Sequence, residues 1–171
     1  LTGEGADEVF AGYDIFREAK VRRFWAKSPQ SECRPRLLEK LYPYLARSPV
    51  AQQAMSRRFF GRNLDQAHRP GFSHDMRWEG TSALKRLMSP EFSSVGVDVV
   101  ARVLDSLPAS FDRWSFLSRD QYLEIRILLA GYLLSCQGDR MLMANSVEGR
   151  FPFLDNDVVR LANSLPADYK L

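Results

Sequence analysis

The chain has 171 residues, a formal net charge of +3, 45% hydrophobic residues and 26% charged residues. This composition excludes disordered, collagen-like and fibrous proteins, and the length suits one domain or a large piece of one. Arginine supplies most of the positive charge, with 19 Arg against 5 Lys. Because the arginines are scattered, we interpret them as solvated surface with a few ion pairs and expect no nucleic-acid partner.

The first part of the chain is predicted to form three helices, because apolar residues recur three and four positions apart between Pro, Gly and Ser. The first would span residues 7–25, with Gly12 as a kink or a point of division. The second would span residues 34–45, and the third would follow Ser48 and end near residue 60. The expected inner stripe of the first helix consists of Val9, Phe10, Tyr13, Phe16, Val21 and Phe24.

Residues 61–80 contain three glycines, a proline and both histidines, which is typical of an irregular surface connection. Short helices are predicted over residues 82–88 and 97–107. The strongest helical signal runs from residue 113 to about 134, and the run Ser135–Gly138 is expected to interrupt it. Two shorter helices would follow, over residues 139–145 and 156–165. Few stretches alternate like strands, so the chain is predicted to be mainly α-helical.

Membrane and zinc-binding proteins are disfavoured by the sequence. The longest apolar run has about eight residues, whereas a membrane-spanning helix needs about twenty. The two cysteines, Cys33 and Cys136, lack metal-like spacing and fit a reducing compartment, so we expect a cytoplasmic protein without a membrane partner. The chain starts with Leu1 rather than Met, so we expect it to be part of a longer protein.

The first thirteen residues, LTGEGADEVFAGY, place two glycines around one carboxylate, directly before a predicted helix. Glycine lets a ligand approach the backbone closely, and free N–H groups at a helix start favour an anion such as phosphate. Carboxylates there, at Asp7 and Glu8, could bind Mg²⁺ beside a nucleotide. The same residues also fit an ordinary helix start, because acidic side chains near a helix N-terminus interact favourably with its dipole.

A second notable segment covers residues 139–155, DRMLMANSVEGRFPFLD. Glu148 and Arg150 flank a glycine, and aromatic residues surround a proline. From the residues alone, this segment is best interpreted as a structural turn held by ion pairs and buried aromatics.

Together, the two segments resemble, in the same order, two segments of glutamine-hydrolysing asparagine synthetases. The first is similar to Ser-Gly-Glu-Gly-Ser/Ala-Asp-Glu-x-Phe-x-Gly-Tyr in that family, and the second to Asp-Arg-Met-x-Met-Ala-x-Ser-x-Glu-x-Arg-x-Pro-Phe-Leu-Asp. Residues 121–171 look like the family almost throughout, whereas residues 25–110 are weakly diagnostic. The resemblance implies that residues 1–171 are a partial synthetase domain, the C-terminal helical portion of an α/β ATP-pyrophosphatase fold.

The family activates the side-chain carboxylate of aspartate with ATP as an acyl-adenylate, and ammonia from a separate glutaminase domain then displaces AMP. Carried over by position, Thr2 and Gly3 would contact ATP, Glu4 would be the catalytic acid, and Asp7 would bind Mg²⁺. Glu8 would hold the substrate amine or orient its neighbours. The resemblance implies that five further charged residues form structural ion pairs around the site and take no part in catalysis. They are Asp139, Arg140, Glu148, Arg150 and Asp155.

Parts of the family pattern are missing from this sequence. The pyrophosphate-binding segment Ser-Gly-Gly-x-Asp-Ser and the N-terminal cysteine of the glutaminase domain are absent, and Lys170 does not match the lysine that stabilises the adenylate. We therefore expect this chain by itself to be inactive. Its expected partners are aspartate, ATP and the glutaminase domain of a parent chain, and a homodimer is compatible with the resemblance.

Two alternatives remain open at the level of the sequence. A related acyl-adenylate enzyme, similar to β-lactam synthetases or lasso-peptide cyclases, would use an internal amine in place of ammonia. A basic helical module that binds nucleic acid or an acidic partner would need no catalysis, and its binding would weaken steeply with salt.

Overall fold

The computed structural model describes residues 1–93 and 96–171, and in these residues every regular element is a helix. The chain divides into two compact units, one made of Leu1–Phe16 with Asp112–Leu171 and the other of Arg17–Phe111. The prediction of a mainly α-helical chain is therefore confirmed. Among the described residues, no helix is both long and apolar enough to span a bilayer.

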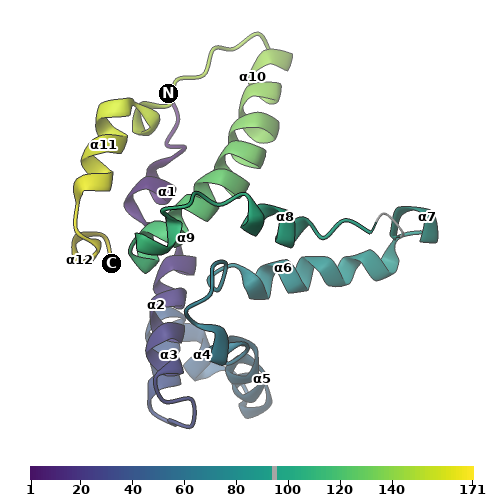
Figure 1. Cartoon of the computed structure of the whole chain (residues 1–171), viewed down its shortest axis with the longest axis vertical. Coiled ribbons are helices and arrows are strands. Elements are labelled where there is room, and N and C mark those ends of the chain that lie inside the picture. Colours follow the sequence, from purple (N-terminus) through teal and green to yellow (C-terminus); the bar gives the residue numbers. More distant parts are fainter. Residues whose placement is uncertain (94–95) are drawn as a thin grey trace. The chain divides into compact units, whose positions relative to one another are not determined.

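The first unit joins the two ends of the chain (Figure 1). Ala11, Ile15, Phe16 and Leu117 form its buried apolar cluster. Its helices are α1 (Ala6–Phe10), α9 (Phe116–Glu124), a π-helical segment (Ile125–Asp139), α10 (Arg140–Ala144), a 3₁₀-helix (Pro152–Leu154), α11 (Asn156–Ser164) and α12 (Ala167–Lys170).

The helices from α9 to α10 follow one another without a break and form a single rod over residues 116–144 (Figure 1). The predicted interruption at Ser135–Gly138 is therefore wrong. The serine is accommodated inside the rod because its Oγ donates a hydrogen bond to the carbonyl of Gly131 (2.8 Å), so its polar group does not compete with the helix. The rod begins later than predicted, because the Ser115 hydroxyl caps α9 by accepting a hydrogen bond from the Ser118 N–H (3.1 Å).

The second unit consists of short helices connected by tight turns. They are α2 (Asp14–Ala26, from Arg17 onward), a 3₁₀-helix (Arg34–Arg36), α3 (Leu37–Leu41), α4 (Pro43–Arg47), α5 (Val50–Phe60), a 3₁₀-helix (Leu64–Gln66), α6 (Asp75–Ser82), a 3₁₀-helix (Ala83–Leu87), α7 (Pro90–Ser93) and α8 (Val99–Asp105). The predicted division at Gly12 is confirmed, since α1 ends at Phe10 and α2 begins at Asp14. The predicted third helix is also confirmed, as α5 follows Ser48-Pro49 and ends at Phe60.

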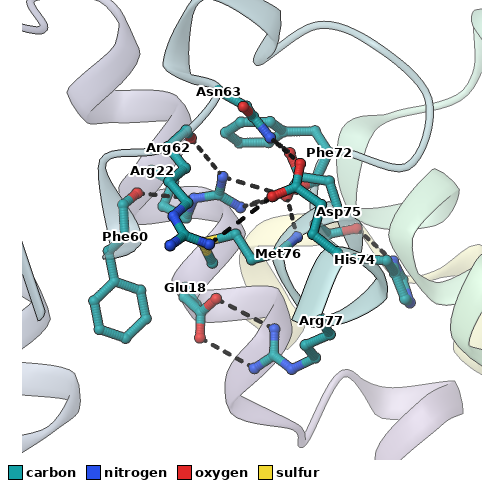
Figure 2. Close-up of polar contacts among 12 residues, drawn as sticks. Glu18, Arg22, Phe60, Arg62, Asn63, Phe72, His74, Asp75, Met76 and Arg77 are labelled. Atoms are coloured by element: carbon teal, nitrogen blue, oxygen red, sulfur yellow. Dashed lines mark hydrogen bonds and ion pairs between the residues drawn. The ribbon is translucent and has the colours of Figure 1, made fainter. Parts of the chain in front are cut away.

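The core of the second unit is organised around Arg22, whose side chain is fully buried. Its guanidinium donates hydrogen bonds to the carbonyls of Phe60 (3.1 Å), Phe72 (2.9 Å) and Arg62 (2.9 Å), and it pairs with Asp75 at 3.4 Å (Figure 2). The guanidinium also stacks on the Phe72 ring, 4.0 Å from its centroid. Arg22 therefore belongs to the few ion-paired arginines that were expected, but it lies in the core and not on the solvated surface.

Residues 61–80 were predicted to be an irregular surface connection, but this network makes them part of the core. Phe72, Ser73, His74 and Met76 are buried, and α6 starts at Asp75 in the middle of the range. The backbone carbonyls of an irregular segment must be hydrogen-bonded if they are buried, and here a side chain from α2 satisfies them. Gly61, Pro70 and Gly71 lie in turns, whereas Gly80 lies inside α6, and none of these residues indicates which neighbours are buried.

The inner stripe predicted for the first helix is correct for Val9 and Phe16, which are buried, and wrong for Phe24, which is 44% exposed. Two charged residues of α2, Arg22 and Glu18, take buried positions instead. Glu18 accepts two hydrogen bonds from Arg77 (3.3 and 3.2 Å) and one from the Tyr42 hydroxyl (3.0 Å) (Figure 2). Apolar periodicity alone could not identify buried ion pairs.

Candidate active site

The Glu4–Gly5 turn lies against the end of the second sequence segment. Gly5 has φ +92°, and a Cβ atom added there would lie 2.3 Å from Cδ2 of Leu154. A side chain at this position would be strained in its backbone and would also clash with Leu154. Glycine is therefore required for the turn to approach residues 152–154 this closely.

A backbone hydrogen bond connects the two segments a second time. The N–H of Thr2 donates to the carbonyl of Arg150 (3.0 Å), and the N–H of Glu4 donates to the Thr2 hydroxyl (3.3 Å). At Gly3, by contrast, an added Cβ would meet no atom within 4 Å. The backbone of Gly3 is thus accessible to a ligand between two residues that the fold holds in place.

A pocket of about 360 Å³ opens where the two segments meet. Thr2 and Glu4 contribute polar side chains, and the rod with its following loop contributes mostly apolar ones. The lining residues are Thr2, Glu4, Gln137, Gly138, Met141, Leu142, Asn145, Val147 and Phe151. An apolar pocket with few convergent polar groups is the usual form of a small-molecule site.

Asp7 is exposed at the start of α1 and faces Gly12, where an added Cβ would lie 2.0 Å from Asp7 Oδ1. α1 is only five residues long, because the predicted first helix is divided at Gly12. Among the described residues, no group of three or more His, Cys, Asp or Glu side chains could hold a metal ion. Mg²⁺ often takes only one or two protein carboxylates together with substrate phosphates, and an exposed Asp7 fits that arrangement.

Glu8 points into the first unit, and it is not one of the residues that line the pocket. It is 1% exposed and accepts a hydrogen bond from the Tyr13 hydroxyl (3.1 Å). Burial raises the pKa of the Glu8 carboxyl, against the lowering effect of its hydrogen bonds. Burial, together with the neighbouring Glu8 charge, also raises the pKa of Tyr13.

The charged residues of the second segment have different surroundings. Glu148 and Arg150 form an exposed ion pair with each other at 2.5 Å. Asp155 caps α11 by accepting a hydrogen bond from the Asp157 N–H (2.9 Å). Asp139 and Arg140 are exposed where the π-helical segment meets α10, and neither forms an ion pair with another described residue.

Sequence reasoning missed two residues that support the turn from inside the first unit, Gln121 and Lys170. The Gln121 side chain donates to backbone carbonyls of α1, and Lys170 donates to Gln121. Nothing in the sequence could have paired residues 112 to 113 positions apart, because a glutamine in a helix is usually a surface residue.

The family model of asparagine synthase matches residues 1–171, the entire chain. The chain belongs to the asparagine synthase family. Within this family, the synthetase domain is an α/β domain of the ATP-pyrophosphatase type, and the helical chain described above is a portion of it.

Several curated members and relatives of the family are similar over the whole chain. A Mycobacterium tuberculosis protein, named provisionally as a glutamine-hydrolysing asparagine synthetase, is 30% identical over 178 residues, which cover 100% of this chain and 24% of that protein. Amidase chyE of Penicillium rubens is 30% identical over 186 residues (100% and 26%). Asparagine synthetase 1 (glutamine-hydrolysing) of Bacillus subtilis is 27% identical over 170 residues (99% and 25%). No solved structure matches the chain significantly.

The chain therefore spans about a quarter of the length of the curated asparagine synthetase relatives that it matches. Both sequence segments that carried the resemblance lie within the matched range, and they supply all the residues that line the pocket except Gln137 and Gly138.

Proposed function

We propose that this chain is part of an ATP-dependent amide ligase that makes asparagine from aspartate. ATP would activate the side-chain carboxylate of aspartate as β-aspartyl-AMP with release of pyrophosphate, and ammonia would then displace AMP. The main support is the pocket of about 360 Å³ in which Thr2 and Glu4 of the first segment face the rod and the loop of the second. Family membership over residues 1–171 supports the same class of reaction.

The roles of the individual residues follow from their surroundings. Thr2 and the open backbone at Gly3 would contact ATP, since no side chain covers that glycine. Glu4 is half-buried at the edge of the pocket, where its carboxylate could accept a proton from the attacking ammonia. Asp7 would hold Mg²⁺, which supplies charge neutralisation on the phosphates when bound. The other residues of the turn fix these groups in position.

Glu8 has a different role in this proposal from the one that the family resemblance suggested. A carboxyl that is buried and bonded to Tyr13 cannot reach a substrate amine in the pocket without leaving its hydrogen bond. We therefore assign Glu8 to the support of α1. The exposed Glu148–Arg150 pair and the Asp155 cap would stabilise the second segment in the same supporting way.

The proposal includes partners outside this chain. A glutaminase domain in a parent protein would supply ammonia, and residues 1–171 would form one partial domain with the synthetase machinery of that parent. Without a pyrophosphate-binding segment, the isolated chain would be inactive. An acyl-adenylate enzyme with an internal amine nucleophile, similar to β-lactam synthetases, is the alternative within the same chemistry.

Glu4→Gln in the full-length protein that contains this chain tests the proposal. Loss of a positioned acid or base typically costs about 10²- to 10⁴-fold in rate, so asparagine formation from aspartate, ATP and glutamine should fall by that factor, while glutamine hydrolysis continues. Glu39→Gln, at an exposed position of α3, is the matched control and should retain full activity.

Asparagine formation at the parental rate in Glu4→Gln would remove Glu4 from the mechanism. Pyrophosphate release with another carboxylic acid, but not with aspartate, would favour the internal-amine alternative.

A further inference from the structure

The short helix α1 ends at Ala11, a residue in the left-handed conformation, after which the chain turns away from the helix. Ala11 has φ +61°, and the N–H groups of Ala11 and Gly12 both donate to the carbonyl of Asp7, that of Gly12 at 2.8 Å. The final carbonyls of a helix need partners from outside the helix. At α1 that partner is a side chain from α9.

The side chain of Gln121 donates two hydrogen bonds to the end of α1. Its Nε2 donates to the carbonyl of Glu8 (2.7 Å) and to that of Val9 (2.8 Å), so both hydrogens of one amide are used on α1. The residue is 5% exposed. A buried amide with both donors engaged holds α1 in one position relative to α9.

Lys170 of α12 determines which way the amide faces. Its Nζ donates to Gln121 Oε1 (3.0 Å) and to the carbonyl of Ala162 (3.2 Å). A lysine ammonium can only donate, so the oxygen of Gln121 must face Lys170 and the nitrogen must face α1. Both acceptors of Lys170 are neutral, and burial lowers the pKa of this lysine.

We propose that Gln121 and Lys170 are positioning residues of the active site, with Lys170 orienting the Gln121 amide and the amide holding α1 and the attached Glu4–Gly5 turn. This inference rests on the proposed function, because it assigns the residues a role in placing Glu4. Thr2 is held separately by the carbonyl of Arg150. Loosening α1 should therefore displace Glu4, and Asp7 within α1 itself, more than Thr2.

The isosteric variant Gln121→Glu tests the donor role without changing the size of the side chain. A carboxylate still accepts from Lys170, but it places oxygens against the carbonyls of Glu8 and Val9. We expect backbone amides of residues 6–12 to exchange with deuterium at least tenfold faster, while α5 is unchanged. Lys170→Met should act in the same direction. Gln52→Glu and Lys40→Met, both at exposed positions of the second unit, are the matched controls.

Kinetics of the full-length protein separate positioning from general stability. Because a small misplacement of a catalytic group can cost about 10²-fold, kcat for aspartate-dependent pyrophosphate release should fall at least tenfold in Gln121→Glu. KM for ATP should change less than kcat, because Thr2 is held separately by the carbonyl of Arg150. A rise in KM for ATP by the same factor as the fall in kcat would overturn the positioning role, and so would parental values of both.

The role of Gln121 can also be tested if the variants do not fold or if the parental protein shows no activity. If both variants fail to fold, NMR of the parental chain decides, since rapid solvent exchange of the Gln121 side-chain amide would contradict the hydrogen bonds to α1. Deuterium exchange at the parental rate in both variants would contradict them too. If the parental protein releases no pyrophosphate with aspartate, the proposed function fails, but the exchange data, which need no substrate, still decide the role of Gln121.

Discussion

The two units of this chain use polar residues in opposite ways. The first unit has 12 Asp and Glu against 7 Arg and Lys, a net charge of −5, whereas the second has 9 against 17, a net charge of +8. The overall charge of +3 hides this division. In the first unit, buried polar side chains hold a short helix beside a pocket. In the second, they connect the core, as Arg22 does through its hydrogen bond to the carbonyl of Phe72.

Charged side chains of the two units therefore differ in whether their hydrogen-bonding groups are all engaged within the protein. Arg22 donates hydrogen bonds to three carbonyls and pairs with Asp75. Glu18 accepts hydrogen bonds from Arg77 and Tyr42. Glu4, by contrast, is half-buried and lines a pocket. The difference suggests that the second unit serves as a scaffold, and substitutions in the two units should separate stability from activity.

The largest effect on stability is expected from Arg22→Met. Removing one partner of a buried ion pair typically costs about 3–5 kcal/mol, and here it also leaves the carbonyls of Phe60, Arg62 and Phe72 without the hydrogen bonds from Arg22. Urea unfolding should show this loss, whereas Arg58→Met, at an exposed position of α5, should change the free energy of unfolding by less than about 0.5 kcal/mol. A loss of the same size in both variants would show that the Arg22 network does not organise the second unit.

A smaller loss is expected in the first unit from Gly5→Ala. A non-glycine residue in a left-handed conformation costs about 1–3 kcal/mol, and the added Cβ would also force Leu154 to move. Gly3→Ala is the matched control two residues away, where nothing lies within 4 Å of the added carbon. Thermal unfolding should therefore distinguish the two variants. Equal melting temperatures would mean that the turn is not in contact with residues 152–154.

The smallest effect is expected from Glu8→Gln and depends on pH. Burial raises the pKa of Glu8 in the folded state, so the folded state holds a proton that the unfolded state has lost. The stability contribution of Glu8 is therefore complete below the unfolded pKa of 4.5 and declines as pH rises through the folded pKa. Glu8→Gln keeps an acceptor for Tyr13 and should remove that decline.

The free energy of unfolding of Glu8→Gln, measured by urea titration between pH 4 and pH 8, should thus fall less with pH than that of the parental chain. Glu39→Gln, on the exposed surface of α3, should follow the parental curve. A parental slope in Glu8→Gln would mean that Glu8 is not desolvated.

Helix positions were predictable where the sequence marks their ends locally. Ser48-Pro49 marks the start of α5, because proline is tolerated at the beginning of a helix, where its missing N–H is not needed. Pro166 marks the end of α11, because proline cannot continue a helix. Ser135–Gly138 misled the prediction, since a serine hydroxyl can bond the carbonyl four residues earlier and stay helical. Residues 61–80 misled it as well, because their burial depends on Arg22, which lies about forty to fifty residues away.

By itself, the sequence determined the helical class, the division at Gly12 and the two segments that carry the family resemblance, since these depend on local backbone preference and residue identity. Only the tertiary structure decided which charges are buried. It brought Thr2 and Glu4 to the rod, placed Glu8 against Tyr13, and gave α1 its support from Gln121 and Lys170. Hydrogen bonds between residues more than a hundred positions apart leave no periodic trace in a sequence, because each partner alone looks like an ordinary surface residue.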